Sequence, residues 1–537
     1  MAAMDTVLIV GAGPIGMTLA LQLHSYGVPV RLIDKSTERR GGSKALTVNP
    51  STLYIFEMLG VASQVIDRGR RLNRATVLWR GHRLTAVSLQ RLAYRHNHLI
   101  MLPQPVTEEI LSARLQEVGV EIEREVALVD VQSTEAGVTA VMLCPNGTTI
   151  REKYAYLVGC DGARSVVRQR LGIPFNGFDY PMHFLLADVR VEWDGPMDEA
   201  FYFVEDSAFL VLLPLTGQHH RIVVSVEGRL DEKGSVTFDD VKDAVNACVG
   251  ERLHLSDPIW VSSAPIYNRL ASALSGAGKV FLAGDAAHLF SPIGGSGMNT
   301  GIGDAFNLGW KLAYVMKGHS DAKLLRSYEG ERLALAQRLV SMTDHLTSLI
   351  SRHAPKDEER WLPQARNRPN LRTIPYHLAG FSHCYDDGLG GLAGRAVRPK
   401  SIAPFIDVIL PSEDERRLWQ GKHILVVNGR SLGKEWPRWA EALAQIRDSF
   451  DAIVKIVVFV NPQLRDCLGE RVAWRANVAA LDACSFPDPG VALIRPDFFV
   501  EMISTGGDAC GDALLALTAL YIIDREEVLP NENIPGR

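Results

Sequence analysis

A glycine-rich turn near the N-terminus constrains the fold of this 537-residue chain more than any other feature. The apolar segment 6–10 predicts a buried strand, and it runs directly into the sequence G-A-G-P-I-G at 11–16. Helical spacing follows over 15–26, and the segment 30–34 predicts a second strand. This order predicts a βαβ unit of the kind that binds dinucleotides.

Each glycine of the turn has a physical role beside a pyrophosphate. Gly11 permits the tight turn, Gly13 lets the backbone approach the phosphates, and Gly16 lets helix and strand pack closely. The helix N-terminus directs free N–H groups and a positive dipole end toward the phosphates. Asp34 ends the second strand, where its carboxylate can accept ribose hydroxyls. The turn by itself does not distinguish NAD from FAD.

Two later motifs favour FAD. The apolar segment 280–283 runs into Gly284-Asp285, and a glycine-rich loop over 291–299 opens a helix predicted over 299–317. A carboxylate at the end of a strand suits the hydroxyls of a second half-nucleotide, and the loop offers N–H donors to a flat, electron-rich ring. The third motif, C-D-G-A-R-S at 160–165, again follows a predicted strand.

These three motifs, in this order, resemble those of the class A flavoprotein monooxygenases, a family typified by para-hydroxybenzoate hydroxylase that includes phenol and polyketide hydroxylases. The resemblance covers residues 5–330. It implies an FAD-dependent monooxygenase that hydroxylates a phenolic or other aromatic substrate with NAD(P)H and O2. NAD(P)H would reduce the flavin, O2 would add at its C4a atom, and the hydroperoxide would transfer OH to the ring. A second dinucleotide fingerprint is not expected, because in this family the reductant binds across the flavin domain.

The resemblance also implies which residues hold the cofactor. The glycine turn and Asp34 would bind the AMP half, Asp285 the ribityl region, and the loop 292–299 the isoalloxazine. The cofactor-binding residues are expected to be Gly11, Gly13, Pro14, Ile15, Gly16, Asp34, Lys35, Lys44, Gln104, Asp161, Arg164, Gly284, Asp285, Pro292, Gly295, Gly297, Met298 and Asn299. The residues expected at the catalytic centre are Pro292, Gly295 and Tyr202.

The chain departs from the family pattern at three positions. Lys44 stands where relatives usually have an arginine, so the charge stays but the bidentate fork is lost. Ser296 and Gly303 stand where relatives often have glutamines. These departures affect fine contacts and leave flavin binding expected.

The predicted fold is α/β, with a split Rossmann-type FAD domain, an inserted antiparallel-sheet substrate domain and a C-terminal thioredoxin-like domain. Strand-like runs between about 180 and 270 predict the antiparallel sheet. The expected boundaries are 1–75, 101–178 and 273–320 for the FAD domain, 76–100 and 179–272 for the substrate domain, 321–394 for a helical and connecting segment, and 395–537 for the thioredoxin-like domain. Without a C-x-x-C motif the last domain cannot cycle a dithiol, so we interpret it as structural or interfacial.

Composition limits the partners. A formal net charge of −5 and seven cysteines without C-x-x-C spacing favour a cytoplasmic protein that binds no nucleic acid, membrane or metal. A monomer or homodimer is expected. His288 is expected to pack beside the cofactor, and the pairs His96/His98 and His219/His220 to lie on surface turns.

Several alternatives stay open at this point. The chain could be a flavin monooxygenase that acts by epoxidation, Baeyer–Villiger insertion or antibiotic inactivation. It could be an FAD oxidase or dehydrogenase that needs no NAD(P)H, or a non-catalytic flavoprotein. Alternate residues of the strands 200–204 and 209–215 should face the flavin, with Tyr202 the one best suited to orient a phenol, but the sequence does not say which face is which.

Overall fold

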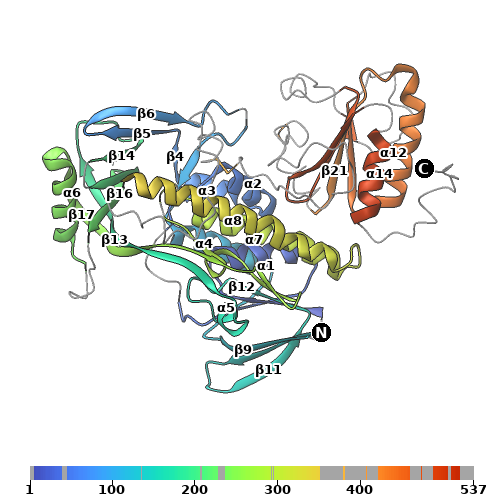
Figure 1. The fold of residues 1–537 in the computed structure, drawn as a ribbon, viewed down its shortest axis with the longest axis horizontal. Coiled ribbons are helices and arrows are strands. Elements are labelled where there is room, and N and C mark those ends of the chain that lie inside the picture. Colours follow the sequence, from blue (N-terminus) through green and yellow to red (C-terminus); the bar gives the residue numbers. More distant parts are fainter. Residues whose placement is uncertain are drawn as a thin grey trace. The chain divides into compact units, whose positions relative to one another are not determined.

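Figure 1 shows a computed structural model of the chain. It describes residues 5–38, 45–92, 94–134, 136–205, 208–227, 236–291, 293, 295–350, 379–380, 407, 421–459, 473–474, 488–505 and 509–520. The chain divides into two compact units. Unit 1 comprises Met1–Phe306 and Leu335–Phe381, and unit 2 comprises Asn307–Ala334 and Ser382–Arg537.

A six-stranded, mainly parallel sheet forms the centre of the dinucleotide-binding part of unit 1. Its order is β18 (Ser275–Gly276), β19 (Val280–Leu282), β12 (Tyr156–Gly159), β1 (Val7–Val10), β2 (Val30–Asp34) and β8 (Ile122–Arg124). All neighbours pair in parallel except β18, which is antiparallel to β19. The carboxyl ends of parallel strands meet at one edge, so all three motifs come together there.

Helices and two small sheets complete this part of unit 1. The helices are α1 (Pro14–Ser25), α2 (Pro50–Leu59), α3 (Ala62–Arg68), α4 (Gln104–Glu117), α5 (Val166–Arg170) and the start of α7 (Gly297–Met316). One small sheet has the order β3 (Thr47–Val48), β7 (Leu99–Met101) and β4 (Arg70–Leu72), and the other β11 (Thr149–Tyr154), β10 (Gly137–Leu143) and β9 (Ala127–Thr134). Helix α1 is buried from Met17 to Leu23 because its residues there are mostly apolar.

A second large sheet of unit 1 contains eight strands and is almost wholly antiparallel. Its order is β20 (His288–Leu289), β17 (His254–Ala271), β13 (Phe175–Glu192), β16 (His219–Glu227), β15 (Phe209–Pro214), β14 (Ala200–Val204), β5 (Arg74–Trp79) and β6 (His82–Ser88). Only β14 and β5 pair in parallel. The antiparallel sheet predicted between 180 and 270 is therefore present, and β17 is an additional strand that the sequence pattern did not indicate.

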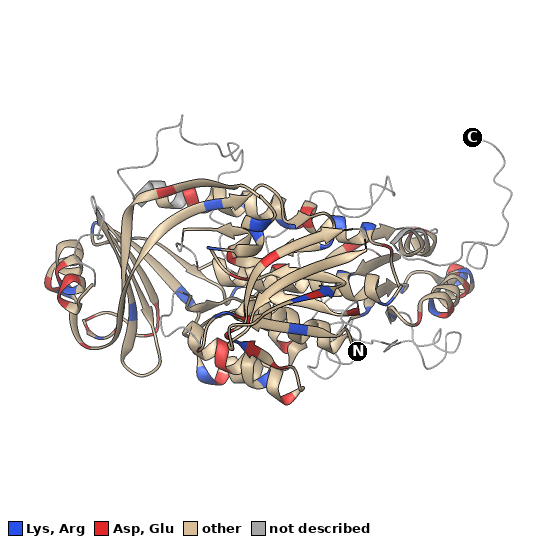
Figure 2. Cartoon of the chain, turned by 90° about the horizontal axis from the view of Figure 1, so that it is seen from below, with Lys and Arg blue, Asp and Glu red and all other residues tan. Residues whose placement is uncertain are grey.

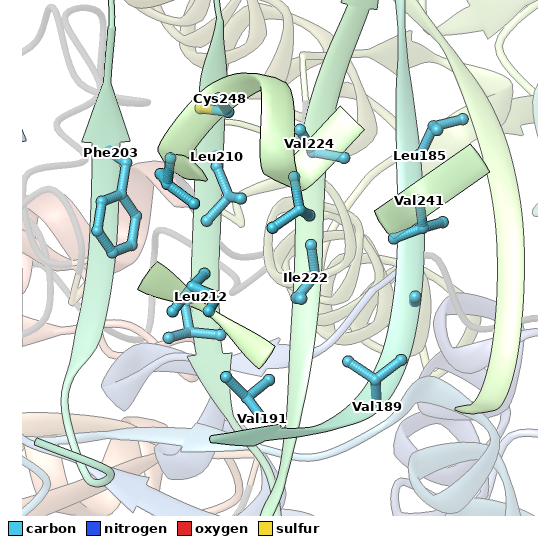
Figure 3. Packing of buried hydrophobic residues seen from close by; sticks show 14 of the residues in the cluster. Leu185, Val189, Val191, Phe203, Leu210, Leu212, Ile222, Val224, Val241 and Cys248 are labelled. Atoms are coloured by element: carbon cyan, nitrogen blue, oxygen red, sulfur yellow. The ribbon is translucent and has the colours of Figure 1, made fainter. Parts of the chain in front are cut away.

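The two faces of this sheet are distinct. One face packs under helix α6 (Phe238–Val249), and Figure 3 shows Phe203, Leu210 and Leu212 on this side with Val241 of the helix. Residues alternate along each strand, so Tyr202 faces the opposite side, where it packs with Phe209 and other apolar residues. Tyr202 therefore shares its face of the sheet with Phe209 and Val211, whereas Phe203, Leu210 and Leu212 face α6.

The described residues of unit 2 form a five-stranded mixed sheet, the helices α12 (Trp436–Phe450) and α14 (Ala509–Leu520), and parts of α7 and α8 (Lys323–Ile350). The order of the sheet is β23 (Ala473–Trp474), β22 (Val454–Phe459), β21 (His423–Asn428), β24 (Gly490–Ile494) and β25 (Val500–Thr505). Strands β21, β22 and β23 pair in parallel, whereas β24 and β25 are antiparallel to their neighbours. The thioredoxin-like fold expected for 395–537 stays a prediction. Of the helical and connecting segment expected over 321–394, the structure describes residues 321–350 and 379–380.

A buried cluster of charges joins this sheet to the helices of unit 2. The guanidinium of Arg495 donates to both oxygens of Glu331 at 2.7 and 2.9 Å and to both oxygens of Asp497 at 3.0 and 2.7 Å. Lys311 of α7 donates to Glu331 at 2.9 Å. Glu331 belongs to α8 (Lys323–Ile350), so a single arginine connects the end of β24 to two helices.

Charge is otherwise spread evenly. Figure 2 shows basic and acidic residues interspersed along the described elements rather than gathered into one region of a single sign. None of the described helices combines the length and the apolar character that a membrane crossing requires.

Candidate active site

The glycine turn after β1 is shaped by two close backbone approaches. Gly11 has φ +105°, and a Cβ there would lie 2.4 Å from the carbonyl oxygen of Cys160. A Cβ on Gly16 would lie 2.0 Å from the carbonyl oxygen of Gly11. A Cβ on Gly13 would meet no described atom within 4 Å, and this residue caps α1 without a side-chain hydrogen bond. Gly11 and Gly16 thus serve the packing of the turn, whereas Gly13 borders open space at a helix N-terminus.

The carboxylate of Asp34 lies beside this turn. It accepts hydrogen bonds from the backbone N–H groups of Ala12 at 2.7 Å and Ser36 at 2.8 Å, and Arg124 Nη1 lies 3.9 Å away. A cavity of about 490 Å³ lies on the other side of Arg124, and Lys35 is exposed. The cavity is lined by Thr37, Glu38, Ser112, Ile122 and Arg124.

One carboxylate oxygen of Asp161 binds the start of α5, and the other has no hydrogen-bond partner among the described residues. Its Oδ2 accepts the backbone N–H groups of Val166 at 2.7 Å and Val167 at 3.2 Å. Its Oδ1 is buried and has no hydrogen-bond partner among the described residues. Burial raises the pKa of this carboxyl. An orphaned buried acceptor at the edge of a nucleotide-binding sheet is suited to a ligand that carries hydroxyl donors.

Arg168 connects the second and third motifs, a role that the sequence analysis did not assign. It donates to the carbonyl oxygens of Ala163 at 2.8 Å and Ala286 at 2.7 Å, and its guanidinium lies 3.8 Å from the ring centre of Phe175. Arg164, the arginine predicted to bind the cofactor, is exposed. The sequence feature that could have indicated this contact is an arginine shortly after the Asp161-Gly162 pair.

Asp304 of α7 stabilises the Gly284-Asp285 turn by a hydrogen bond to its backbone. Asp304 Oδ2 accepts the backbone N–H of Gly284 at 3.0 Å and lies 2.7 Å from His288 Nε2. Both side chains are buried, and the ring of His288 stacks on Phe290. Asp285 itself is exposed at the strand edge.

Close packing at the start of α7 brings the first and second motifs together. A Cβ on Gly284, which has φ +64°, would lie 2.9 Å from Cγ1 of Ile15. A Cβ on Gly301 of α7 would lie 3.0 Å from the Cα of Gly284. Pro14 is the first residue of α1 and is buried. The N-termini of α1 and α7 therefore both border the Gly-Asp turn.

Asn299 fixes the loop that precedes α7. Its amide nitrogen donates to the carbonyl oxygens of Thr47 at 2.8 Å and Gly295 at 2.9 Å, and its oxygen accepts from Asn49 N at 3.0 Å and Thr52 Oγ1 at 2.8 Å. These four hydrogen bonds occupy the side chain, so it positions the loop. Gly295 has φ +64°, Gly297 begins α7, and Met298 is buried. Pro292 and Lys44 lie outside the described residues.

Gln104 begins α4 close to the same loop region. Its amide nitrogen donates to Glu108 Oε1 at 2.8 Å, and its backbone N–H donates to the carbonyl oxygen of Ala45 at 3.1 Å. Ala45 immediately follows Lys44 in the chain. Gln104 is thus anchored to the residue that follows Lys44, one of the residues expected to bind the cofactor.

Tyr202 shares an apolar cluster with the loop that precedes α7. It belongs to the apolar cluster on the face opposite α6, and Ile293 of the loop packs against the same cluster. The ring centres of Tyr202 and Phe209 lie 6.2 Å apart, and burial raises the pKa of the Tyr202 phenol. An aromatic, apolar face therefore lies beside the loop that leads to the glycine-rich start of α7.

The prediction that the paired histidines lie on surface turns is wrong for three of them. His96, His98 and His220 are buried. His96 Nε2 lies 2.8 Å from Glu57 Oε1 of α2, His98 immediately precedes β7, and His220 belongs to β16. Burial, with Arg71 nearby, lowers the pKa of His98 to about 4. Within the described ranges no three His, Cys, Asp or Glu side chains gather as a metal site would require.

These features fit FAD. Open space beside Gly13 at an uncapped helix start, the orphaned oxygen of Asp161 and the cavity beside Arg124 suit a dinucleotide bound in an extended form. The glycine-rich start of α7, with an aromatic face beside the loop that leads to it, suits a flat ring at the other end of the dinucleotide. The fold and site therefore define a flavin-binding protein.

Comparison with known proteins agrees. Residues 4–343 match the family described as FAD binding domain. The chain is 37% identical to the 6-methylpretetramide 4-monooxygenase of Streptomyces rimosus over 64% of this chain and 62% of that relative. It is 32% identical to a rifampicin monooxygenase of Streptomyces venezuelae over 88% of this chain and 98% of that relative. An anhydrotetracycline hydroxylase from Streptomyces rimosus has a similar structure, with a TM-score of 0.69, 25% identity and coverage of 96% and 99% of the two chains.

The chain belongs to the FAD-binding domain family, and it is a flavin-dependent monooxygenase.

The contact between Asp304 and the Gly-Asp turn leads to a testable expectation. Asp304→Asn keeps the size of the side chain but removes the charge that holds Gly284 N–H and His288. We expect FAD to bind about tenfold more weakly, ~1.4 kcal/mol. Titration of apoprotein with FAD, followed by flavin fluorescence, measures this. Asp321→Asn is the matched control, because Asp321 is exposed and its carboxylate contacts only Lys323 at the start of α8 among the hydrogen bonds and ion pairs of the described residues. Equal FAD affinity in Asp304→Asn and the parent would show that the turn does not depend on Asp304.

Proposed function

We propose that the chain hydroxylates a phenolic, polyketide-type aromatic compound with O2 and NAD(P)H. One observation carries this proposal most directly. The aromatic and aliphatic face around Tyr202 packs against Ile293 of the loop before α7, where the flavin ring is expected. The names of the relatives support the substrate class, since they refer to 6-methylpretetramide, rifampicin and anhydrotetracycline.

Each of the three motifs would bind a different part of FAD. The N–H groups at the start of α1, with Gly13 beside them, would hold the pyrophosphate, and Asp34 the adenosine ribose. Asp161 and Asp285 would accept ribose or ribityl hydroxyls. The loop from Gly295 to Asn299 would lie against the isoalloxazine. FAD, when bound, supplies the redox chemistry and the activation of O2.

The protein contributes charge stabilisation and exclusion of water. Helix α7 begins at Gly297, so its first N–H groups and positive dipole end are available to negative charge that develops on the ring. Apolar residues of the face around Tyr202 exclude water from the reacting region. The same face positions the aromatic substrate by packing and leaves few polar groups to specify its orientation.

The C-terminal fold belongs to this proposal as well. We infer a thioredoxin-like domain within 395–537, supported by the order β22-β21-β24-β25 with β21 and β22 parallel and the last two strands antiparallel. We also retain the domain boundaries that the sequence indicates. The described cysteine of this region, Cys510, is buried, which supports a structural rather than a redox role.

Oxygen and NAD(P)H consumption tests the proposed function. We expect purified holoenzyme to oxidise NADPH or NADH slowly alone and at least about tenfold faster with a fitting aromatic compound, ~1.4 kcal/mol of barrier. One atom of 18O2 should enter the product. A panel of phenols and non-aromatic polyketides is the probe. Anaerobic bleaching of the flavin by an aromatic compound without NAD(P)H would instead indicate an oxidase or dehydrogenase and contradict the proposal.

A further inference from the structure

A polar group of three side chains interrupts the apolar face that carries Tyr202. Tyr180 of β13 belongs to that apolar cluster, and its hydroxyl donates to Asp344 Oδ1 of α8 at 2.6 Å. Asn268 of β17 pairs across the strands with Phe178, which precedes Tyr180 by two residues on β13. All three side chains are buried, with 3% of Tyr180, 6% of Asp344 and 1% of Asn268 exposed. All three belong to unit 1.

The group lies next to the loop that is expected to face the flavin. Arg269 and Leu270, which follow Asn268, pair with Leu289 and His288 of β20. That strand leads within a few residues to Ile293, which packs on the same apolar cluster as Tyr180. The polar group therefore lies at the flavin end of the sheet.

Within this polar group, one hydrogen-bond acceptor, Asn268 Oδ1, has no partner among the described residues. Asn268 Nδ2 donates to the carbonyl oxygen of Val340 at 3.3 Å. Burial raises the pKa of Tyr180, and Asp344 raises it further, so the phenol stays protonated as the donor, while hydrogen bonds from Thr347 and Asn268 act in the opposite direction. Asn268 Oδ1 is buried and has no partner anywhere in the described part of the chain. A buried carbonyl of this kind costs free energy until an N–H or O–H donor reaches it.

We propose that Tyr180, Asn268 and Asp344 form the polar end of the substrate pocket and that Asn268 Oδ1 accepts a hydrogen bond from a hydroxyl of the aromatic substrate. The inference rests on the proposed function and names the residues that orient the ring. The chemistry follows from the missing partner, which must be a donor. A phenolic or enolic hydroxyl supplies one, whereas its methyl ether does not. Asn268 forms a hydrogen bond with Tyr180, and the Tyr180 hydroxyl is held by Asp344, so Tyr180 and Asp344 act as positioning residues.

The test combines a change in the protein with the same change in the ligand. The probe is the fused-ring phenol from a panel that shifts the flavin absorbance of the holoenzyme most strongly, together with its methyl ether. In the parent enzyme, methylation should weaken binding about tenfold. In Asn268→Leu, which removes the amide at similar volume, phenol and ether should bind within about twofold of each other. Tyr180→Phe should lose part of the discrimination.

Controls separate recognition from packing. Tyr267→Phe is the matched control, because Tyr267 is the next residue toward the N-terminus in β17 and points to the other face. It should keep the full preference for the phenol. The FAD affinity of every variant should equal that of the parent, which shows that the holoenzyme is intact.

Two outcomes would overturn the inference. If Asn268→Leu weakens phenol and ether by the same factor, the cluster only packs α8 against the sheet or holds a water. If no aromatic compound shifts the flavin spectrum of the parent or stimulates its NAD(P)H oxidation, the proposed function fails and the inference fails with it. Measuring the parent first distinguishes these two results.

Discussion

Gly13→Val is expected to yield a folded protein that has lost FAD. A Cβ at this position would meet no described atom of the chain, so the apoprotein can accommodate it. The added isopropyl group would instead occupy the space from which N–H groups at the start of α1 reach the pyrophosphate. We expect FAD affinity to fall at least about 100-fold, ~2.7 kcal/mol, because donors to an anion are lost. Fluorescence titration of the apoprotein with FAD provides the measurement.

Two other glycines serve as controls for this result. Gly330→Val introduces the same side chain at an exposed position of α8 that also has open space around it, and it should leave FAD affinity unchanged. Gly16→Val should prevent normal folding, because its Cβ would lie 2.0 Å from a backbone oxygen. Thermal unfolding of the apoproteins distinguishes the cases. FAD occupancy in Gly13→Val equal to that of the parent would place the pyrophosphate elsewhere.

The elements around the first motif could be predicted because their signals are local. An apolar strand, a glycine turn and an apolar helix occur in sequence, and the structure has them as β1, the turn and α1 within one or two residues of the predicted ends. The strand Ala200–Val204 was likewise predicted with the bounds that the structure shows. In each case the apolar pattern of a short segment determines the element.

Elements and contacts that depend on distant partners could not be predicted in this way. Strand β17 contains Asp257, Pro258 and several serines, and it forms because β13 supplies its partner along most of its length. The burial of His96 depends on Glu57, 39 residues earlier. The Asn268 and Asp344 contacts join segments 72 and 164 residues apart. Local propensity carries no information on such pairs.

The site shows the same division between local and distant signals. Gly13, Asp34 and Asp285 could be named because each follows a strand in a recognisable motif. Asp304, which holds the Gly284-Asp285 turn, was missed. The hydrogen bonds by which Arg168 joins Ala163 to Ala286 were not predicted either. Asp304 is an acidic residue on the buried side of the apolar helix α7, and a buried charge there implies a partner. An acidic residue on the apolar side of this helix was visible in the sequence, and it could have indicated the role of Asp304.

Arg495→Met is expected to destabilise the protein by ~3–5 kcal/mol. Arg495 is fully buried and donates four hydrogen bonds to Glu331 and Asp497, so its removal leaves two carboxylates without their main partner. Lys311 still donates a hydrogen bond to Glu331, and Asn307 to Asp497, but neither replaces the four hydrogen bonds of the guanidinium. Thermal and urea unfolding, each followed by circular dichroism, measure the loss. The control is Arg447→Met, which breaks the largely exposed pair with Asp448 on α12 and should cost less than ~1 kcal/mol.

The pH dependence of this loss tests its electrostatic origin. Burial alone would raise the pKa of Glu331, but Arg495 and Lys311 lower it from 4.5 to about 2. The folded-state pKa is below the unfolded one, so this group stabilises the parent fully above pH 4.5 and progressively less as the pH falls toward 2. In Arg495→Met the main group that lowers this pKa is gone, and protonating Glu331 relieves an uncompensated charge. The difference in stability between parent and variant should therefore narrow as the pH is lowered from 4.5 toward 2. A difference that stays constant over this range would mean that Arg495 stabilises unit 2 by packing rather than by its charge.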